Sequence, residues 1–256
     1  MALRGLLLSI SWVFLLVACQ STPPDVARVE APVAAPVQAE PPPVAAPDPR
    51  DLPPADIWER IRRDLSWGKW HDSRINSARR HFLRQNDYMG VVAGRGSLFL
   101  YYIVEELERR NMPLELALLP MVESAFDPFA FSSQSAAGLW QIIPSTGKYL
   151  GLEQSWWYDG RLDLRDSTRA ALDYLQELHR YFEGDWLLAV AAYNGGKSRV
   201  RRAQRRNQKS GRPDDFWSLR LPRETRSYVP RLLALTSIVD RPDAVASTHL
   251  RAHETT

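Results

Sequence analysis

The sequence predicts a mainly α-helical fold for residues 56–241. Apolar residues in this region recur three and four positions apart, which is the spacing of one face of a helix. Ser, Asp, Gly and Pro stand where these stretches begin and end, as capping and breaking residues do. No stretch alternates apolar and polar residues over the length of a strand, although GLWQII at 138–143 is compatible with a short β-ribbon.

Two helices are expected in the first part of this region. Asp56 is placed to cap a helix whose apolar face includes Ile57 and Ile61. Ser97 is placed to cap a second helix, LFLYYIVEELERR. That helix should end at Asn111, because a proline follows two residues later.

A proline-punctuated stretch comes next. Pro113, at a first helical position, is expected to open LELALLPMVESAF. Pro120 then breaks or kinks that helix just before Glu123, because proline lacks the backbone N–H that a helix interior needs.

Three helices are expected in the second half. Asp166 or Ser167 should begin TRAALDYLQELHRYF, which Gly184 ends. DWLLAVAAYNGG is apolar on all sides and is therefore predicted to be a buried central helix, capped by the turn at 194–196. RSYVPRLLALTSIV is the last predicted helix.

The N-terminus predicts export and lipid attachment. Residues 1–18 read as a signal peptide whose apolar segment is too short to span a bilayer, and the run ends at Cys19 in what resembles a bacterial lipobox. An ordinary signal peptide, or a membrane anchor that happens to contain a cysteine, is the alternative. Residues 19–55 are rich in Pro and Ala and should form an extended tether, while residues 242–256 should be a disordered tail. Because Gln20 rather than Asp follows the cysteine, analogy with other bacterial lipoproteins indicates the outer membrane, facing the periplasm.

Composition excludes some classes of partner and bond. The net charge of +3 is too small to indicate nucleic acid binding. The single cysteine excludes an intrachain disulfide. The nine tryptophans suit either a core or stacking against sugar rings.

Glu123 is the first candidate catalytic residue. It lies between apolar residues, which should partly desolvate its carboxyl and raise its pKa, as a general acid requires. Fifteen residues later, Trp140 offers a stacking face and Gln141 a donor and an acceptor. The alternative for this second segment is a tight turn with a core tryptophan.

Tyr193 and Asn194 are the next candidates, at the end of the predicted buried helix. They are expected to meet a ligand in the same cleft as Glu123. The alternative is that Asn194 only caps its helix.

Six stretches occur in order: ALLPMVESAF, SAAGLWQIIPSTG, WWYDGRLDL, STRAALDYLQELH, GDWLLAVAAYNGG and LPRETRSYVPRLLAL. Together they resemble the soluble-lytic-transglycosylase-like family, and within it the membrane-bound transglycosylase D group, over residues 56–241. The resemblance implies a lysozyme-like α+β fold and cleavage of peptidoglycan glycan strands without metal or cofactor.

The resemblance also implies residue roles. Glu123 matches the family's single catalytic glutamate. Four residues match cleft positions that hold the sugar: Ser132, Gln141, Tyr193 and Asn194. Trp140 stands where many relatives have methionine. Tyr228 matches a tyrosine that closes the site from the last helix.

Two departures from the family pattern stand out. Alanine often occupies the position of Gly195. C-terminal LysM repeats are common in the D group, whereas about fifteen residues follow the predicted domain here. Substrate retention is therefore expected to depend on the cleft, the lipid anchor or a partner.

Two other functions stay open at this point. A hydrolytic muramidase would need a second carboxylate, for which Asp127, Asp159 and Asp163 are the nearby candidates. A peptidoglycan-binding lipoprotein without turnover would need no catalytic carboxylate at all. The segment 156–158 (WWY) fits sugar subsites or core packing equally well. The basic run at 199–206 suits either acidic peptides or a solvated helix face.

Overall fold

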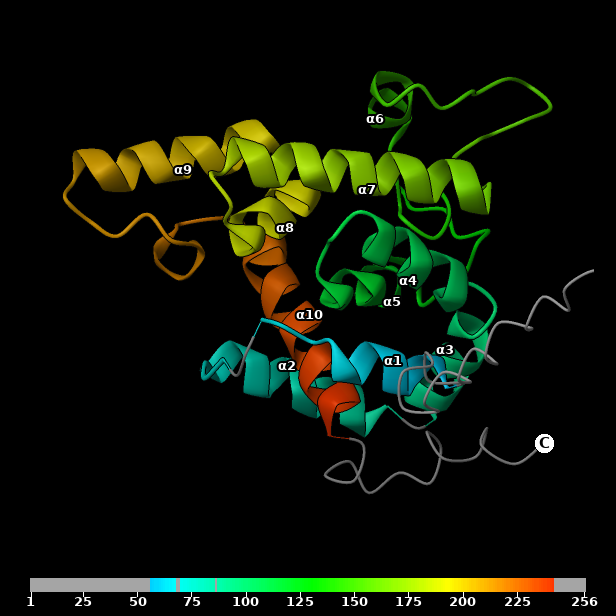
Figure 1. The fold of residues 1–256 in the computed structure, drawn as a ribbon. Coiled ribbons are helices and arrows are strands. Elements are labelled where there is room, and N and C mark those ends of the chain that lie inside the picture. The colour runs from blue at the N-terminus through cyan, green and yellow to red at the C-terminus, as the bar shows by residue number, and fades with distance from the viewer. Residues whose placement is uncertain (1–55, 68–69, 86, 242–256) are drawn as a thin grey trace, which may run out of the picture. The chain divides into compact units, whose positions relative to one another are not determined.

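The computed structural model describes residues 56–67, 70–85 and 87–241. The expected signal peptide, Cys19, tether and C-terminal tail lie outside the described residues. Within the described residues, the secondary structure is helical apart from isolated β-bridges, which confirms the mainly α class (Figure 1).

The helices, in chain order, are α1 (Ile57–Arg63), α2 (Ser73–Arg84), α3 (Tyr88–Gly96), α4 (Leu100–Arg109), the 3-10 helix η1 (Leu114–Leu118), α5 (Leu119–Ser124), α6 (Pro144–Tyr149), α7 (Leu164–Tyr181), α8 (Trp186–Gly195), α9 (Lys197–Lys209), the 3-10 helix η2 (Phe216–Ser218) and α10 (Arg223–Asp240). None of those described is long and apolar enough to cross a membrane.

Two predicted boundaries near the N-terminus of this region are confirmed. The Asp56 side chain accepts a hydrogen bond from the Trp58 amide at 3.0 Å and caps α1. Pro120 separates η1 from α5 by standing in the first turn of α5, where its missing N–H has no intrahelical role. Glu123 consequently lies at the end of a helix of only six residues.

Two predicted caps are wrong. Ser97 does not cap α4: its hydroxyl donates to the Gly94 carbonyl at 2.7 Å at the end of α3, and α4 begins at Leu100. Helix α7 begins earlier than Asp166, because Asp163 accepts a hydrogen bond from the Asp166 amide at 2.8 Å and is the actual cap.

Helix α8 is the buried centre that its apolar sequence predicts. It packs against α7, α9 and α10, and Ala189 to Ala192 are fully buried. Helix α10 packs against α8 near its start and then extends past η1 to α2 and α1 (Figure 1). The C-terminal ends of α5 and α8 and the N-terminal part of α10 thus meet in one place.

The predicted ribbon at 138–143 is a small set of antiparallel bridges. Ala137 is bridged to both Phe131 and Ile142. Gly138 turns the chain with φ of 75°, and a Cβ there would lie 2.2 Å from the Arg161 carbonyl oxygen. Only glycine fits this turn, because an added methyl group would overlap the backbone.

Candidate functional site

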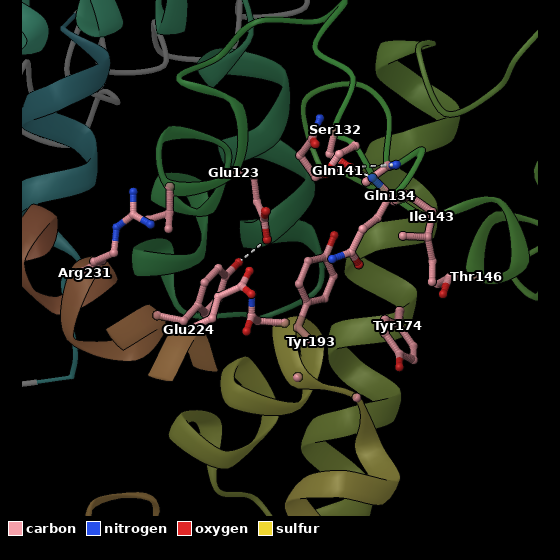
Figure 2. Close-up of a pocket in the computed structure, with 18 of the residues that line it drawn as sticks. Glu123, Ser132, Gln134, Gln141, Ile143, Thr146, Tyr174, Tyr193, Glu224 and Arg231 are labelled. Atoms are coloured by element: carbon pink, nitrogen blue, oxygen red, sulfur yellow. Dashed lines mark hydrogen bonds between the residues drawn. The ribbon is translucent and has the colours of Figure 1, made fainter. Parts of the chain in front are cut away.

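A cleft of about 570 Å³ lies where α5, α8 and α10 meet (Figure 2). Its walls come from the end of α5, the ribbon at 131–143, α6, α7, the end of α8 and the start of α10. Glu123 points into the cleft from α5 and Tyr193 from α8 (Figure 2). Ser132, Gln141, Asn194 and Tyr228 also line it, so the structure brings together six of the seven residues expected there.

Glu123 is the half-buried carboxyl at the centre of this cleft. Burial raises its pKa from 4.5 to about 7, because the apolar surroundings disfavour the charged form. The hydrogen bond from Tyr228 and the positive charge of Arg231 act in the opposite direction, while the charge of Glu224 adds to the rise. At neutral pH the carboxyl is therefore poised between its acid and base forms.

Tyr228 is the direct partner of this carboxyl. Its hydroxyl donates a hydrogen bond to Oε1 of Glu123, and its side chain is only 3% exposed. Burial, followed by the neighbouring charge of Glu123, raises the pKa of the Tyr228 phenol well above its ordinary value. The phenol thus keeps its proton and serves as a fixed donor.

Tyr193 is tied to the ribbon. Its hydroxyl donates to the backbone carbonyl of Trp140 at 2.8 Å, and burial raises its pKa well above the ordinary value. Its ring lies 5.9 Å from that of Tyr174 on α7. The end of α8 is therefore fixed against the opposite wall of the cleft.

The expectation that Trp140 stacks on a ligand is wrong. Its side chain is fully buried and does not line the cleft, and its indole N–H donates to the Thr168 hydroxyl at 3.0 Å. The alternative of a core tryptophan in a tight turn holds for this residue. Its contribution to the cleft is the backbone carbonyl that holds Tyr193.

Gln141 and Ser132 shape the ribbon side. The Gln141 amide donates to the carbonyls of Ala130 at 3.1 Å and Gly138 at 2.9 Å, with φ of 45° at Gln141 itself. The Ser132 hydroxyl accepts from the Ala136 amide at 3.0 Å. With its N–H groups engaged by the backbone, Gln141 can offer its carbonyl oxygen as an acceptor.

Asn194 lines the cleft in the last turn of α8. The capping residue of α8 is Gly196, with φ of 87°. The position of Asn194 is consistent with a ligand contact rather than with a cap alone.

The three aspartates considered as second carboxylates do not line the cleft. Asp127 accepts the Phe129 amide at 2.9 Å, and Asp163 caps α7. Asp159 pairs with Arg161 at 2.6 Å, which lowers the pKa of its carboxyl. Each is used in a local structural role.

Sequence reasoning missed Glu224 and Arg231, which reach the cleft from α10. Spacing was the available signal, because positions 224, 228 and 231 lie on one face of a helix. Two residues of the segment 156–158 fit neither of the two expectations, core packing or sugar subsites. Trp156 is 95% exposed and Trp157 is 68% exposed, so neither is core, and neither lines the cleft.

The sequence of this mainly helical domain matches a known family. Residues 101–216 match the family described as Transglycosylase SLT domain. The chain is 43% identical over 150 residues to the "Putative tributyltin chloride resistance protein" of Alteromonas sp. (strain M-1), covering 59% of this chain and 72% of the relative. The chain belongs to the transglycosylase SLT family.

A second relative is more similar in sequence. Over 187 residues the chain is 49% identical to the "Membrane-bound lytic murein transglycosylase D" of Escherichia coli (strain K12). The match covers 73% of this chain and 41% of the relative, so the chain spans less than half the length of that protein. Among solved structures, the X-ray structure of an inactive mutant of the lytic transglycosylase Slt from Pseudomonas aeruginosa superposes with a TM-score of 0.45. That superposition has 21% identity and covers 77% of this chain and 34% of the other.

Proposed function

We propose that this chain is a peptidoglycan lytic transglycosylase. It would cleave the β-1,4 bond between N-acetylmuramic acid and N-acetylglucosamine and leave a 1,6-anhydro end on the muramic acid. The observation that carries this proposal is Glu123, a half-buried carboxyl whose pKa is raised to about 7, held by Tyr228 in a cleft of about 570 Å³. The SLT family membership and the names of the relatives support it.

In this proposal Glu123 acts twice. As an acid it gives its proton to the glycosidic oxygen, and the bond from that oxygen to C1 of the muramic acid breaks. The 2-acetamido oxygen of the same sugar bonds to C1 and takes up the positive charge. As a carboxylate, Glu123 then removes the proton of the C6 hydroxyl, whose oxygen attacks C1 and displaces the acetamido oxygen. The carboxyl is regenerated, and because the attack is intramolecular no water has to be held.

The surrounding residues have supporting roles in this proposal. Tyr228 and Arg231 stabilise the carboxylate that exists between the two proton transfers, since both lower the pKa of Glu123. Ser132, Gln141, Tyr193 and Asn194 position the sugars from the two walls of the cleft. The low polarity that raises the pKa of Glu123 keeps it able to donate a proton near neutral pH.

The product tests the proposal. We expect digestion in water enriched in heavy oxygen to release muropeptides that end in anhydro sugars, one water lighter than reducing sugars and without label at C1. We expect Glu123→Gln to abolish this release, because the amide cannot cycle a proton.

One observation favours a second candidate, hydrolysis. Glu224 also lines the cleft and is a second carboxylate there. Hydrolysis with inversion uses one carboxyl group to protonate the glycosidic oxygen and a second, as a base, to activate a water. Labelled reducing ends as the main product would establish this muramidase reaction and reject the transglycosylase. A binding lipoprotein without turnover would release nothing.

We propose the same division of the chain that the sequence predicts. Residues 1–18 would be removed as a signal peptide, Cys19 would be lipidated, and residues 19–55 would tether the catalytic region, 56–241, to the outer membrane on its periplasmic side. Residues 242–256 would be a disordered tail. The term membrane-bound in the name of the Escherichia coli relative supports membrane attachment.

A further inference from the structure

Helix α9 carries a row of cations that the proposed reaction does not use. Its sequence, KSRVRRAQRRNQK, has seven Lys and Arg residues and no acid. Val200, Ala203 and Asn207 face the interior. Four exposed residues follow one flank of the helix at spacings of three and four, and we call them the basic stripe: Arg199, Arg202, Arg206 and Lys209.

The two flanks of α9 differ in how their charges are used. On the flank towards α7, Lys197 pairs with Glu177 at 2.6 Å and Arg201 with Glu183 at 3.7 Å. Within the described part of the chain, no residue of the basic stripe lies within ion-pair distance of a carboxylate. The stripe is therefore an unneutralised positive surface and not part of an internal network.

The basic stripe begins at the edge of the cleft. Arg199 donates to the Gly195 carbonyl at 3.0 Å, and Gly195 is a cleft residue. A Cβ at Gly195 would lie 2.7 Å from the Thr225 hydroxyl, so this edge also adjoins the first turn of α10. Farther along, Arg206 approaches the carbonyl of exposed Arg220 at 3.5 Å, and Arg220 adds a cation beside the stripe.

We propose that the basic stripe binds the carboxylates of the peptides attached to the glycan strand whose sugars occupy the cleft. This inference rests on the proposed function and adds a specificity surface to it. The peptides branch from muramic acid, so they must leave the cleft over its edge. From Arg199 to Lys209 the helix rises about 15 Å, enough to follow several residues of peptide.

The test compares two triple variants that lose the same charge. Arg199→Gln/Arg202→Gln/Arg206→Gln removes most of the stripe. Arg80→Gln/Arg84→Gln/Arg95→Gln removes exposed cations from α2 and α3, which contribute no residue to the cleft. Each is measured on peptide-bearing peptidoglycan and on glycan strands whose peptides an amidase has removed.

We expect the stripe variant to raise KM about five- to tenfold on the peptide-bearing substrate, as the loss of three exposed ion pairs implies. Its KM on bare strands, its kcat and its thermal midpoint should match wild type, and its salt dependence should be shallower. The α2/α3 variant should match wild type on both substrates. Equal KM changes on both substrates, or no change on either, would overturn the inference.

A binding measurement tests the basic stripe independently of whether the proposed reaction takes place. Co-sedimentation with peptidoglycan is measured with the stripe variant in a Glu123→Gln background, so that no cleavage is needed. Weaker sedimentation that is confined to the peptide-bearing material supports the stripe even if the transglycosylase reaction is rejected.

An anionic membrane is the alternative occupant of the basic stripe. If the variant lost binding to vesicles of anionic phospholipid but kept binding to peptidoglycan, the surface would be a lipid surface and the inference would be wrong.

Discussion

The hydroxyl of Tyr228 donates a hydrogen bond to Oε1 of Glu123 across 105 positions of the chain. This bond favours the ionised carboxyl, whereas burial favours the neutral one, and burial has the larger effect. The resulting pKa of about 7 is higher than that of a glutamate in water but low enough for the carboxylate to form during a reaction cycle.

Tyr228→Phe should slow cleavage and move its pH profile. Removing the donor raises the pKa of Glu123, because the Tyr228 hydrogen bond lowers it. The carboxylate formed in the first proton transfer loses a charged hydrogen bond of about 1.5–3 kcal/mol, so kcat/KM should fall roughly 10- to 100-fold. In wild type, kcat/KM should decline as pH rises through about 7, and in the variant this decline should begin at a higher pH. An unmoved alkaline limb would show that Glu123 is not the titrating acid.

Glu123→Gln should stabilise the fold in a pH-dependent way. Because the pKa of Glu123 is 4.5 in its ordinary state and about 7 in the fold, the folded chain holds this proton more tightly than the unfolded chain. Wild-type stability should therefore fall between these two pH values, by at most about 3 kcal/mol. The variant lacks this loss, so its advantage in urea unfolding should grow from pH 4.5 to pH 7. A constant difference across that range would contradict the raised pKa.

Gly138→Ala should destabilise the ribbon that carries Gln141. The new methyl group would lie 2.2 Å from the Arg161 carbonyl oxygen at a left-handed backbone position, and we expect a loss of about 2–4 kcal/mol. Gly151→Ala is the matched control, with φ of 72° and nothing within 4 Å of the added group. It should cost only about 1–2 kcal/mol for the left-handed conformation. Equal shifts in urea midpoint would mean that the contact with Arg161 is relieved without cost.

Cys19→Ala should release the protein from the membrane fraction and leave its activity in solution intact. The reason is that the proposed lipid chains on Cys19 would supply the anchoring free energy, at about 0.8 kcal/mol per buried CH₂. Feeding cells a labelled fatty acid should mark wild type only. A labelled variant would place the lipid elsewhere and refute the lipobox.

The sequence predicted the helices whose own residues carry a strong apolar pattern. Helices α7, α8 and α10 were expected from apolar residues spaced along them. Helices α2 and α3 were not. Helix α2 is mostly polar and buries only Ile75 and Phe82, and α3 contains three glycines in nine residues. Helix α2 is held largely by packing against α10. Its formation depends on residues far away in the chain, so the sequence of α2 alone did not predict it.

The candidate site was predictable to the extent that its residues fall in recognisable stretches. Glu123, Ser132, Gln141, Tyr193, Asn194 and Tyr228 all reach one cleft. The direction in which a side chain points was less predictable. Trp140 is buried in the core, where the Thr168 hydroxyl on α7 accepts the hydrogen bond of its indole N–H. Glu224 and Arg231 enter the cleft because they share the face of α10 that carries Tyr228, a spacing that the sequence contains but that was not used.

Helix α10 is the last cleft element in chain order, and it supplies Glu224, Tyr228 and Arg231. A nascent chain that has emerged only as far as α9 would lack the Tyr228 hydroxyl that hydrogen-bonds Glu123, and one wall of the cleft would be missing. The six-residue helix that carries Glu123 is also far too short to keep its shape alone. If the proposed reaction holds, the site for it would therefore be complete only after α10 has packed against α5 and α8.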